Sequence, residues 1–235
     1  MKKSVRAMLV ALPLVLPAVV TAQPVTRATY ITREQIQHVN RLPGTDRQIV
    51  SQNIGELNLA VGIIHRGCTP TGTPTCPAPA GRGGGGGQAA GGRAGGGGGG
   101  GQAAGGGRAG AGGAAVTGPC GVTTGTSSGA NGIAHDGQTE TYIITSGSGT
   151  LVTGGQILNG NRSNPGGGIL NGPSCSGEIT GDVVSRVVYE GDVIIIPAGV
   201  PHGWSVIPDH VDYLSVRPDP QRLIPDYTNP AVVIN

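Results

Sequence analysis

The chain lacks phenylalanine and has only one tryptophan and five tyrosines, so aromatic residues make up 3% of its 235 residues. Charged residues make up 12%, with 15 positive and 13 negative side chains. So few aromatics argue against a surface on which nucleic-acid bases stack. The near-balanced charge argues against attraction to nucleic acid or to an anionic membrane. We therefore expect no nucleic-acid partner.

Long hydrophobic runs are also lacking, apart from one near the N-terminus. Three positive residues precede an apolar run over 8–20 that contains two prolines, and small residues lead up to Ala22. This run is shorter than the ~20 apolar residues that span a bilayer, so residues 1–22 are predicted to be a secretory signal peptide. Its removal takes away three of the 15 positive charges and leaves a net charge of −1. We expect a periplasmic or secreted protein without an integral membrane span after cleavage.

Cysteine is scarce, with four residues: Cys68, Cys76, Cys120 and Cys175. None of their spacings matches the close pairs that are typical of structural zinc sites. In an exported protein, four cysteines favour two disulfides. Three pairings are open: a Cys68–Cys120 bridge would close off the segment between them, whereas a Cys68–Cys76 bridge would only brace a short loop.

Glycine, in contrast, is abundant and concentrated in one segment. It occupies 21 of the 33 positions over 81–113, which contain no aromatic, β-branched or acidic residue. Such a segment has little to bury against the conformational entropy of glycine, so we predict a disordered loop. The predicted organisation is a signal peptide (1–22), an N-terminal helix and first barrel strands (23–66), a cysteine-flanked glycine-rich low-complexity insertion (67–119) and the main barrel (120–235).

The remaining chain has the pattern of an all-β protein. Thr32 and Gln35 form a capping box that predicts one short helix over 32–42. Short runs rich in Val, Ile, Thr and Tyr are separated by turn residues and predict strands over 47–54, 58–66, 139–155, 182–199 and 210–218. Many short strands with a single helix favour an antiparallel β-sandwich or barrel.

Two stretches carry the residues most suited to chemistry. The stretch "GIAHDGQTETYIITSG" over 132–147 places His135 five residues before Glu140, at the start of an apolar strand. The stretch "GDVIIIPAGVPHGW" over 191–204 ends a buried run in a turn that is followed by His202. A histidine beside an apolar barrel wall is either a hydrogen-bonded core residue or a metal ligand.

Together the two stretches resemble the motifs of the cupin superfamily. The second motif, G-x5-P-x-G-x2-H-x3-N, is matched at Gly191, Pro197, Gly199 and His202, with Val206 at the asparagine position. The first motif, G-x5-H-x-H-x3–4-E-x6-G, is matched at His135, Glu140 and Gly147, with Ile133 in place of its first histidine. The resemblance extends over about 55–218. It implies an all-β, antiparallel double-sheet β-barrel of the jelly-roll kind that holds a metal or ligand at its open end.

The resemblance implies that His135, Glu140 and His202 are the metal ligands. Two imidazoles and one carboxylate suit iron, manganese, nickel, cobalt or zinc and leave positions for water or substrate. Without a metal, Glu140 is expected to be poorly paired near an apolar wall. In the alternative interpretation, Ile133 marks a site that has lost its metal. Since cupin barrels often pair through their sheets, the resemblance also allows a homodimer.

Other residues are candidates for shaping the pocket. Tyr142 lies on the same strand face as Glu140 and is expected to orient a substrate or to act as a weak acid. Arg186 is either a pocket cation for an acidic substrate or a residue at the sheet edge. His65 is either a replacement ligand or a surface histidine. The turn-rich segment 155–181 is expected to be a loop that covers the barrel and is fastened by Cys175.

Three functions follow from these patterns. The first is a metal-dependent oxygenase or isomerase that acts on a small molecule, with Tyr142 and Arg186 placing the substrate. The second is a non-catalytic module that binds a small ligand in the same cavity. The third is an envelope interaction protein in which the glycine-rich segment is the functional part. No residue identifies the substrate, because one barrel fold hosts many chemistries.

Overall fold

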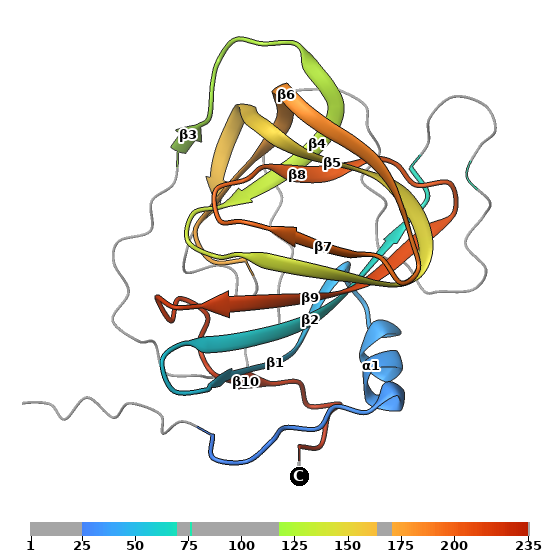
Figure 1. Ribbon diagram of the computed structural model, residues 1–235, viewed down its shortest axis with the longest axis vertical. Helices are drawn as coiled ribbons and strands as arrows, with labels where there is room; N and C mark the ends of the chain where they lie inside the picture. Colours follow the sequence, from blue (N-terminus) through green and yellow to red (C-terminus); the bar gives the residue numbers. More distant parts are fainter. Residues whose placement is uncertain (1–24, 70–75, 77–117, 164–170, 235) are drawn as a thin grey trace, which may run out of the picture.

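A computed structural model describes residues 25–69, 76, 118–163 and 171–234 (Figure 1). The predicted signal peptide and nearly all of the glycine-rich insertion lie outside the described residues. The elements in chain order are α1 (Arg33–Asn40), β1 (Asp46–Asn53), β2 (Asn58–Gly67), β3 (Gly118–Cys120), β4 (Ser127–His135), β5 (Glu140–Ser163), β6 (Ser174–Tyr189), β7 (Val193–Ile196), β8 (His202–Val206), β9 (His210–Asp219) and β10 (Tyr227–Thr228).

The strands form a closed antiparallel barrel, which confirms the predicted fold class. The strand order is β10-β1-β2-β9-β5-β6-β4-β8, and the additional pairing of β8 with β5 closes the barrel. The long strand β5 joins the two sheets, because its first part pairs with β7 and β9 and its later part pairs with β6 and β8. Figure 1 shows β5 passing from the sheet of β2 and β9 to that of β4 and β8.

Aromatic residues are few but gather in the main core. Tyr142, Trp204 and Tyr213 are at most 9% exposed, and the ring centroids of Tyr142 and Tyr213 lie 4.3 Å apart. The Trp204 Nε1–H donates to the Tyr213 hydroxyl at 3.3 Å, so the indole keeps a partner in the interior. Trp204 is therefore a core residue.

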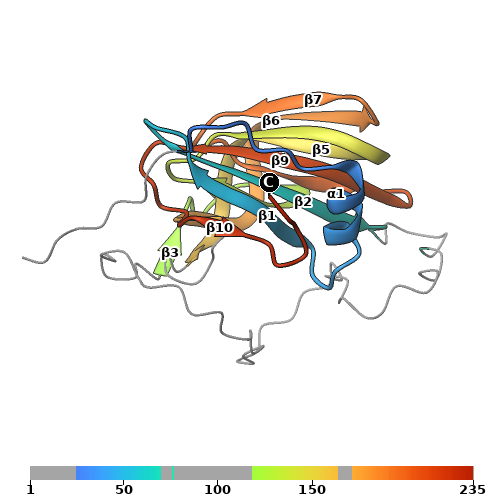
Figure 2. The ribbon, with the colours of Figure 1, turned by 90° about the horizontal axis from the view of Figure 1, so that it is seen from below.

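Helix α1 covers the outer face of the sheet formed by β1 and β2 (Figure 2). The capping box is confirmed: Thr32 Oγ1 accepts from the Gln35 backbone N–H, and the Gln35 side chain accepts from the Thr32 N–H. Val39 on the helix packs against Ile49, Ile63 and Val232 in a second apolar cluster. No helix in the described residues is long and apolar enough to cross a membrane.

The structure contains two disulfides, and they form one of the three possible pairings of the four cysteines. Cys68 bonds to Cys76, eight residues away, and Cys120 bonds to Cys175, 55 residues away. The first lies directly after the end of β2. The second ties β3 to β6, so it links the end of the glycine-rich insertion to the barrel wall.

The prediction of a covering loop over 155–181 is wrong for most of that segment. Most of it is not a covering loop, because β5 continues to Ser163 and β6 begins at Ser174. These two strands pair from Ser148↔Tyr189 to Ser163↔Ser174. Pairing with a neighbouring strand, together with the Cys120–Cys175 bond, stabilises polar residues as strands that their composition alone would not predict.

Candidate metal-binding site

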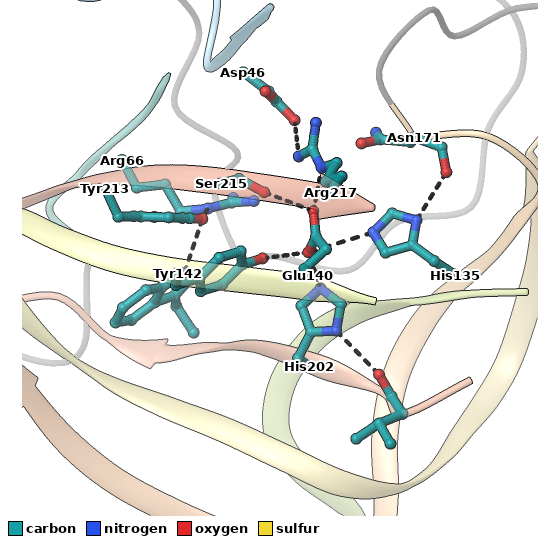
Figure 3. A network of polar contacts seen from close by, with 12 residues as sticks. Asp46, Arg66, His135, Glu140, Tyr142, Asn171, His202, Tyr213, Ser215 and Arg217 are labelled. Atoms are coloured by element: carbon teal, nitrogen blue, oxygen red, sulfur yellow. Dashed lines mark hydrogen bonds and ion pairs between the residues drawn. The ribbon is translucent and has the colours of Figure 1, made fainter. Parts of the chain in front are cut away.

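His135, Glu140 and His202 meet inside the barrel (Figure 3). They come from the end of β4, the start of β5 and the start of β8, and their side chains are at most 3% exposed. Glu140 Oε2 lies 3.0 Å from His202 Nε2 and 3.5 Å from His135 Nε2. The three ligand atoms all lie within 4.8 Å of one another, so this group could hold a metal ion.

The close approach of β4 and β8 brings the two histidines together. Ile133 pairs with His202 in the antiparallel register, and glycines permit the contact on either side. A Cβ at Gly203 would stand 2.0 Å from the Asn131 carbonyl oxygen, so only glycine fits there. The Gly199 N–H, from the turn before β8, donates to the His135 carbonyl oxygen at 2.7 Å. The glycine and turn residues of the motif thus position the imidazoles.

Each imidazole is oriented by a backbone carbonyl group. His135 Nδ1 lies 2.8 Å from the Asn171 carbonyl oxygen, and His202 Nδ1 lies 3.0 Å from that of Val200. A carbonyl oxygen only accepts, so both Nδ1 atoms carry the hydrogen and both Nε2 atoms of neutral rings present a lone pair. This tautomer, fixed from the far side of the ring, is the one that a histidine ligand uses.

His202 Nε2 is buried and has no hydrogen-bond partner, although it lies beside Glu140 Oε2. Two lone-pair nitrogens that face a carboxylate oxygen repel one another unless a cation lies between them or the rings are protonated. Ligand atoms that share a metal at about 2.0–2.2 Å stand roughly 3–3.5 Å apart, and Glu140 Oε2 lies 3.5 Å and 3.0 Å from the two Nε2 atoms. The donor set therefore fits a divalent metal ion.

The prediction that Glu140 is poorly paired without a metal is wrong. Its Oε1 accepts from Arg217 Nε and, at 3.0 Å, from Ser215 Oγ, and its Oε2 accepts from the Tyr142 hydroxyl at 2.9 Å. Figure 3 shows these groups around the carboxylate. Arg217 Nη2 also donates to Asp46 Oδ2 at 2.8 Å, so the buried guanidinium joins two acids.

The electrostatics follow from these contacts. Burial by itself raises the pKa of Glu140, but the charge of the Arg217 guanidinium, together with the contacts to His135 and His202, outweighs it and holds the pKa well below its usual range. Burial and the neighbouring Glu140 charge raise the pKa of Tyr142 well above its usual value. At neutral pH, Glu140 is therefore a carboxylate and Tyr142 is a neutral hydroxyl that donates to it.

Arg217 and Ser215 were not predicted from the sequence. They follow Tyr213 at alternate positions of β9, so all three side chains point to the inside of the barrel. This alternation could have predicted from the sequence that the three side chains share one face of the strand. Strand β9 was predicted, but the distance of 75 or more residues to Glu140 hid the contact.

Two of the predicted pocket residues lie elsewhere. Arg186 is exposed on β6, so it is not a pocket cation, and Arg217 is the cation at the site. His65 lies outside the cluster, where its Nδ1 contacts Asp212 Oδ1 at 2.5 Å. Among the described residues, the cluster therefore offers three ligands, and no histidine replaces the one missing at Ile133.

The position of Gln138 was also missed. It lies between His135 and Glu140 in sequence and is 2% exposed, and among the described residues neither of its side-chain polar atoms has a hydrogen-bond partner. A buried amide without partners costs about 1–3 kcal/mol. The sequence gives no signal for this, because glutamine is usually exposed.

The chain was also compared with known proteins. No family model and no curated protein matches it. Solved structures that match include oxalate oxidase (19% identity, TM-score 0.23, covering 44% of this chain and 41% of that chain) and recombinant oxalate oxidase in complex with glycolate (19%, 0.23, 50% and 44%). A third is oxalate oxidase in complex with the substrate analogue glycolate (13%, 0.28, 82% and 56%).

The match thus spans about half the length of these structures. Their TM-scores of 0.23–0.28 are too low to carry an argument about this chain. The antiparallel barrel agrees with the cupin resemblance that the sequence motifs indicated. Function must therefore be argued from the residues of this chain.

Proposed function

We propose that this protein binds a divalent transition metal through His135, Glu140 and His202, and that the metal binds a small molecule. The observation that carries this proposal is the pair of lone-pair Nε2 atoms facing Glu140 Oε2. Iron, manganese, nickel, cobalt and zinc all suit two imidazoles and one carboxylate. A bound metal would act as a Lewis acid toward an oxygen-containing ligand, as oxygenases and isomerases require.

The chain's own residues define the roles around that ion. Arg217 and Ser215 occupy Glu140 Oε1, so the carboxylate would offer the metal only Oε2. Tyr142 donates to the same Oε2, which keeps its hydroxyl close to any ligand at the site. Burial excludes bulk water and strengthens the electrostatic interactions between these groups.

A second candidate is a non-catalytic ligand-binding module without metal. It is favoured by the complete pairing of Glu140 with Arg217, Ser215 and Tyr142, which satisfies the carboxylate before any metal arrives. Under this candidate, the two imidazoles would carry a proton in place of the metal. A small ligand would then stabilise the protein in the presence of a chelator.

We further propose that the protein is exported. The signal-like residues 1–22 support this, and so do the two disulfides, which persist in oxidising compartments.

A homodimer is proposed through β6 and β7. Residues 183–189 of β6 and the whole of β7 line one side of β5, and the described strands supply no partner on their other side (Figure 2). Alternate residues there are apolar and 49–69% exposed: Val187, Tyr189, Val193 and Ile195. Such an unpaired apolar edge is a template for another strand.

The charges on this edge fit a second copy of the chain. If two β6 strands paired antiparallel about Val188, Arg186 of each copy would lie opposite Glu190 of the other, and Val187 opposite Tyr189. An interface of this kind is self-complementary, as a two-fold dimer requires. The proposal therefore gives Arg186 a role in assembly.

The metal proposal is tested by thermal unfolding of chelator-treated protein with each of the five metals. A ligand at about 100 times its dissociation constant stabilises the folded state by about 2.7 kcal/mol. We expect such stabilisation in the wild type and its loss in His135→Ala and His202→Ala. His210→Ala, which removes an exposed imidazole, is the matched control. Equal stabilisation of all variants would contradict the site.

A further inference from the structure

Gln138 has a buried side chain whose polar atoms form no hydrogen bond with any of the described residues. It lies in the connection between β4 and β5 and is 2% exposed, yet neither Oε1 nor Nε2 has a hydrogen-bond partner. Buried polar groups are almost always hydrogen-bonded, so each exception needs an explanation. A core position with no need for hydrogen bonding would favour an apolar residue of similar size.

This carboxamide packs against the segment that orients the candidate ligand His135. It packs against Gly172, where a Cβ would stand 2.7 Å from Gln138 Nε2. Gly172 has a φ of +54°, so its lack of a side chain serves both the turn and the space for the amide. The preceding residue, Asn171, accepts the hydrogen bond from His135 Nδ1. One short segment therefore orients a metal ligand and makes room for Gln138.

We propose that Gln138 recognises a small molecule that is bound through an oxygen atom to the metal. Its Nε2 would donate to the ligand and its Oε1 would accept from it. This inference rests on the proposed metal site. A carboxamide presents a donor and an acceptor side by side, so it complements a ligand that has an N–H or O–H next to a carbonyl oxygen.

The net charge of the proposed metal site further limits the class of ligand. A divalent ion held by one carboxylate and two neutral imidazoles keeps one net positive charge. The nearby cation, Arg217, is already paired with Glu140 and Asp46. A singly charged ligand is therefore favoured, such as a small hydroxamic acid or a 2-hydroxy acid.

The first test is stability in the presence of a chelator. Gln138→Leu removes the unpaired carboxamide and keeps a similar volume, so its melting temperature should rise by roughly 2–4 °C. Gln221→Leu is the matched control, because the Gln221 carboxamide packs over Gly137 nearby but is exposed. A lower melting temperature for Gln138→Leu would overturn the inference, since Gln138 would then support the fold itself.

The second test measures ligand affinity on metal-loaded protein by calorimetry. Acetohydroxamate has an N–H beside its metal-binding oxygens, whereas azide binds metals and has no N–H or O–H. Gln138→Leu should bind acetohydroxamate about tenfold more weakly, about 1.4 kcal/mol, with unchanged metal content and azide affinity. Unchanged acetohydroxamate affinity would overturn this inference alone. A wild type that takes up no metal would overturn the proposed function as well.

Discussion

Arg217 and Glu140 form an ion pair in the interior of the barrel, with side chains 2% and 1% exposed. Arg217 Nε and Ser215 Oγ both donate to Oε1, whereas Oε2 faces the two imidazoles. The guanidinium thus keeps the carboxylate charged and turns one oxygen toward the candidate metal site. It also satisfies the carboxylate in the absence of metal, so the fold does not depend on metal to neutralise Glu140.

Arg217→Met should destabilise the protein strongly. The substitution leaves Glu140 and Asp46 without their shared cation, and removing one partner of a buried ion pair costs about 3–5 kcal/mol. Arg33→Met, at an exposed position of α1, should change the free energy of unfolding by about 0.5 kcal/mol or less. Urea unfolding of both variants makes the comparison, and similar losses would argue against a structural role for the buried pair.

The two disulfides should differ in their contribution to stability. Cys120 and Cys175 are 55 residues apart in sequence. Loop-closure entropy therefore predicts that replacing both by alanine lowers the free energy of unfolding by about 4 kcal/mol. The same change at Cys68 and Cys76, eight residues apart, should cost about 2.5 kcal/mol. Urea unfolding of the two double variants measures the difference. A larger loss for the Cys68–Cys76 pair would contradict this ordering.

Asp212 should make stability fall in acid. Burial raises the pKa of Asp212, but hydrogen bonds with His65 and Ser146 outweigh it and lower the pKa below its usual value. A carboxyl group with a lowered folded pKa contributes stability above its unfolded pKa of about 3.9, and this is lost as pH falls through the folded pKa. Asp212→Asn should therefore be less stable than the wild type at pH 6. The difference in their free energies of unfolding should become smaller as the pH falls toward 3. A constant deficit would contradict the assignment.

The proposed dimer makes a charge-reversal prediction. Arg186→Glu would place like charges opposite one another in the proposed pairing about Val188 and should weaken dimerisation by roughly tenfold or more. The double variant with Glu190→Arg restores opposite charges and should recover the dimer. Light scattering across a concentration series gives the mass of each variant. A wild type that is monomeric throughout, or a double variant no better than the single one, would refute the interface.

Local patterns predicted the parts of the fold that depend on local interactions. The capping box placed α1, and short runs rich in Val, Ile, Thr and Tyr between turn residues placed β1, β2 and β9 within about one residue of their observed ends. Strands β4 and β8 were not predicted, because β4 is rich in small residues and β8 is only five residues long. Their pairing with each other and with β5 and β6 stabilises them, and that information is not local.

The same division holds for the site. The spacing of His135, Glu140 and His202 within two motifs was sufficient to bring them together as candidate ligands. Arg186 was wrongly considered for the pocket because alternation shows that residues share a face, but not which face is inside. Arg217 was missed because its contact with Glu140 joins strands 77 residues apart.

The metal content of the protein tests the central claim most directly. Untagged protein purified from the periplasm should contain iron, manganese, nickel, cobalt or zinc in near-stoichiometric amount by elemental mass spectrometry. A parallel preparation of His202→Ala, folded by circular dichroism, should lack that metal, since the variant loses one of three ligands. A folded wild type that contains no metal and takes up none of the five when they are added would contradict the account.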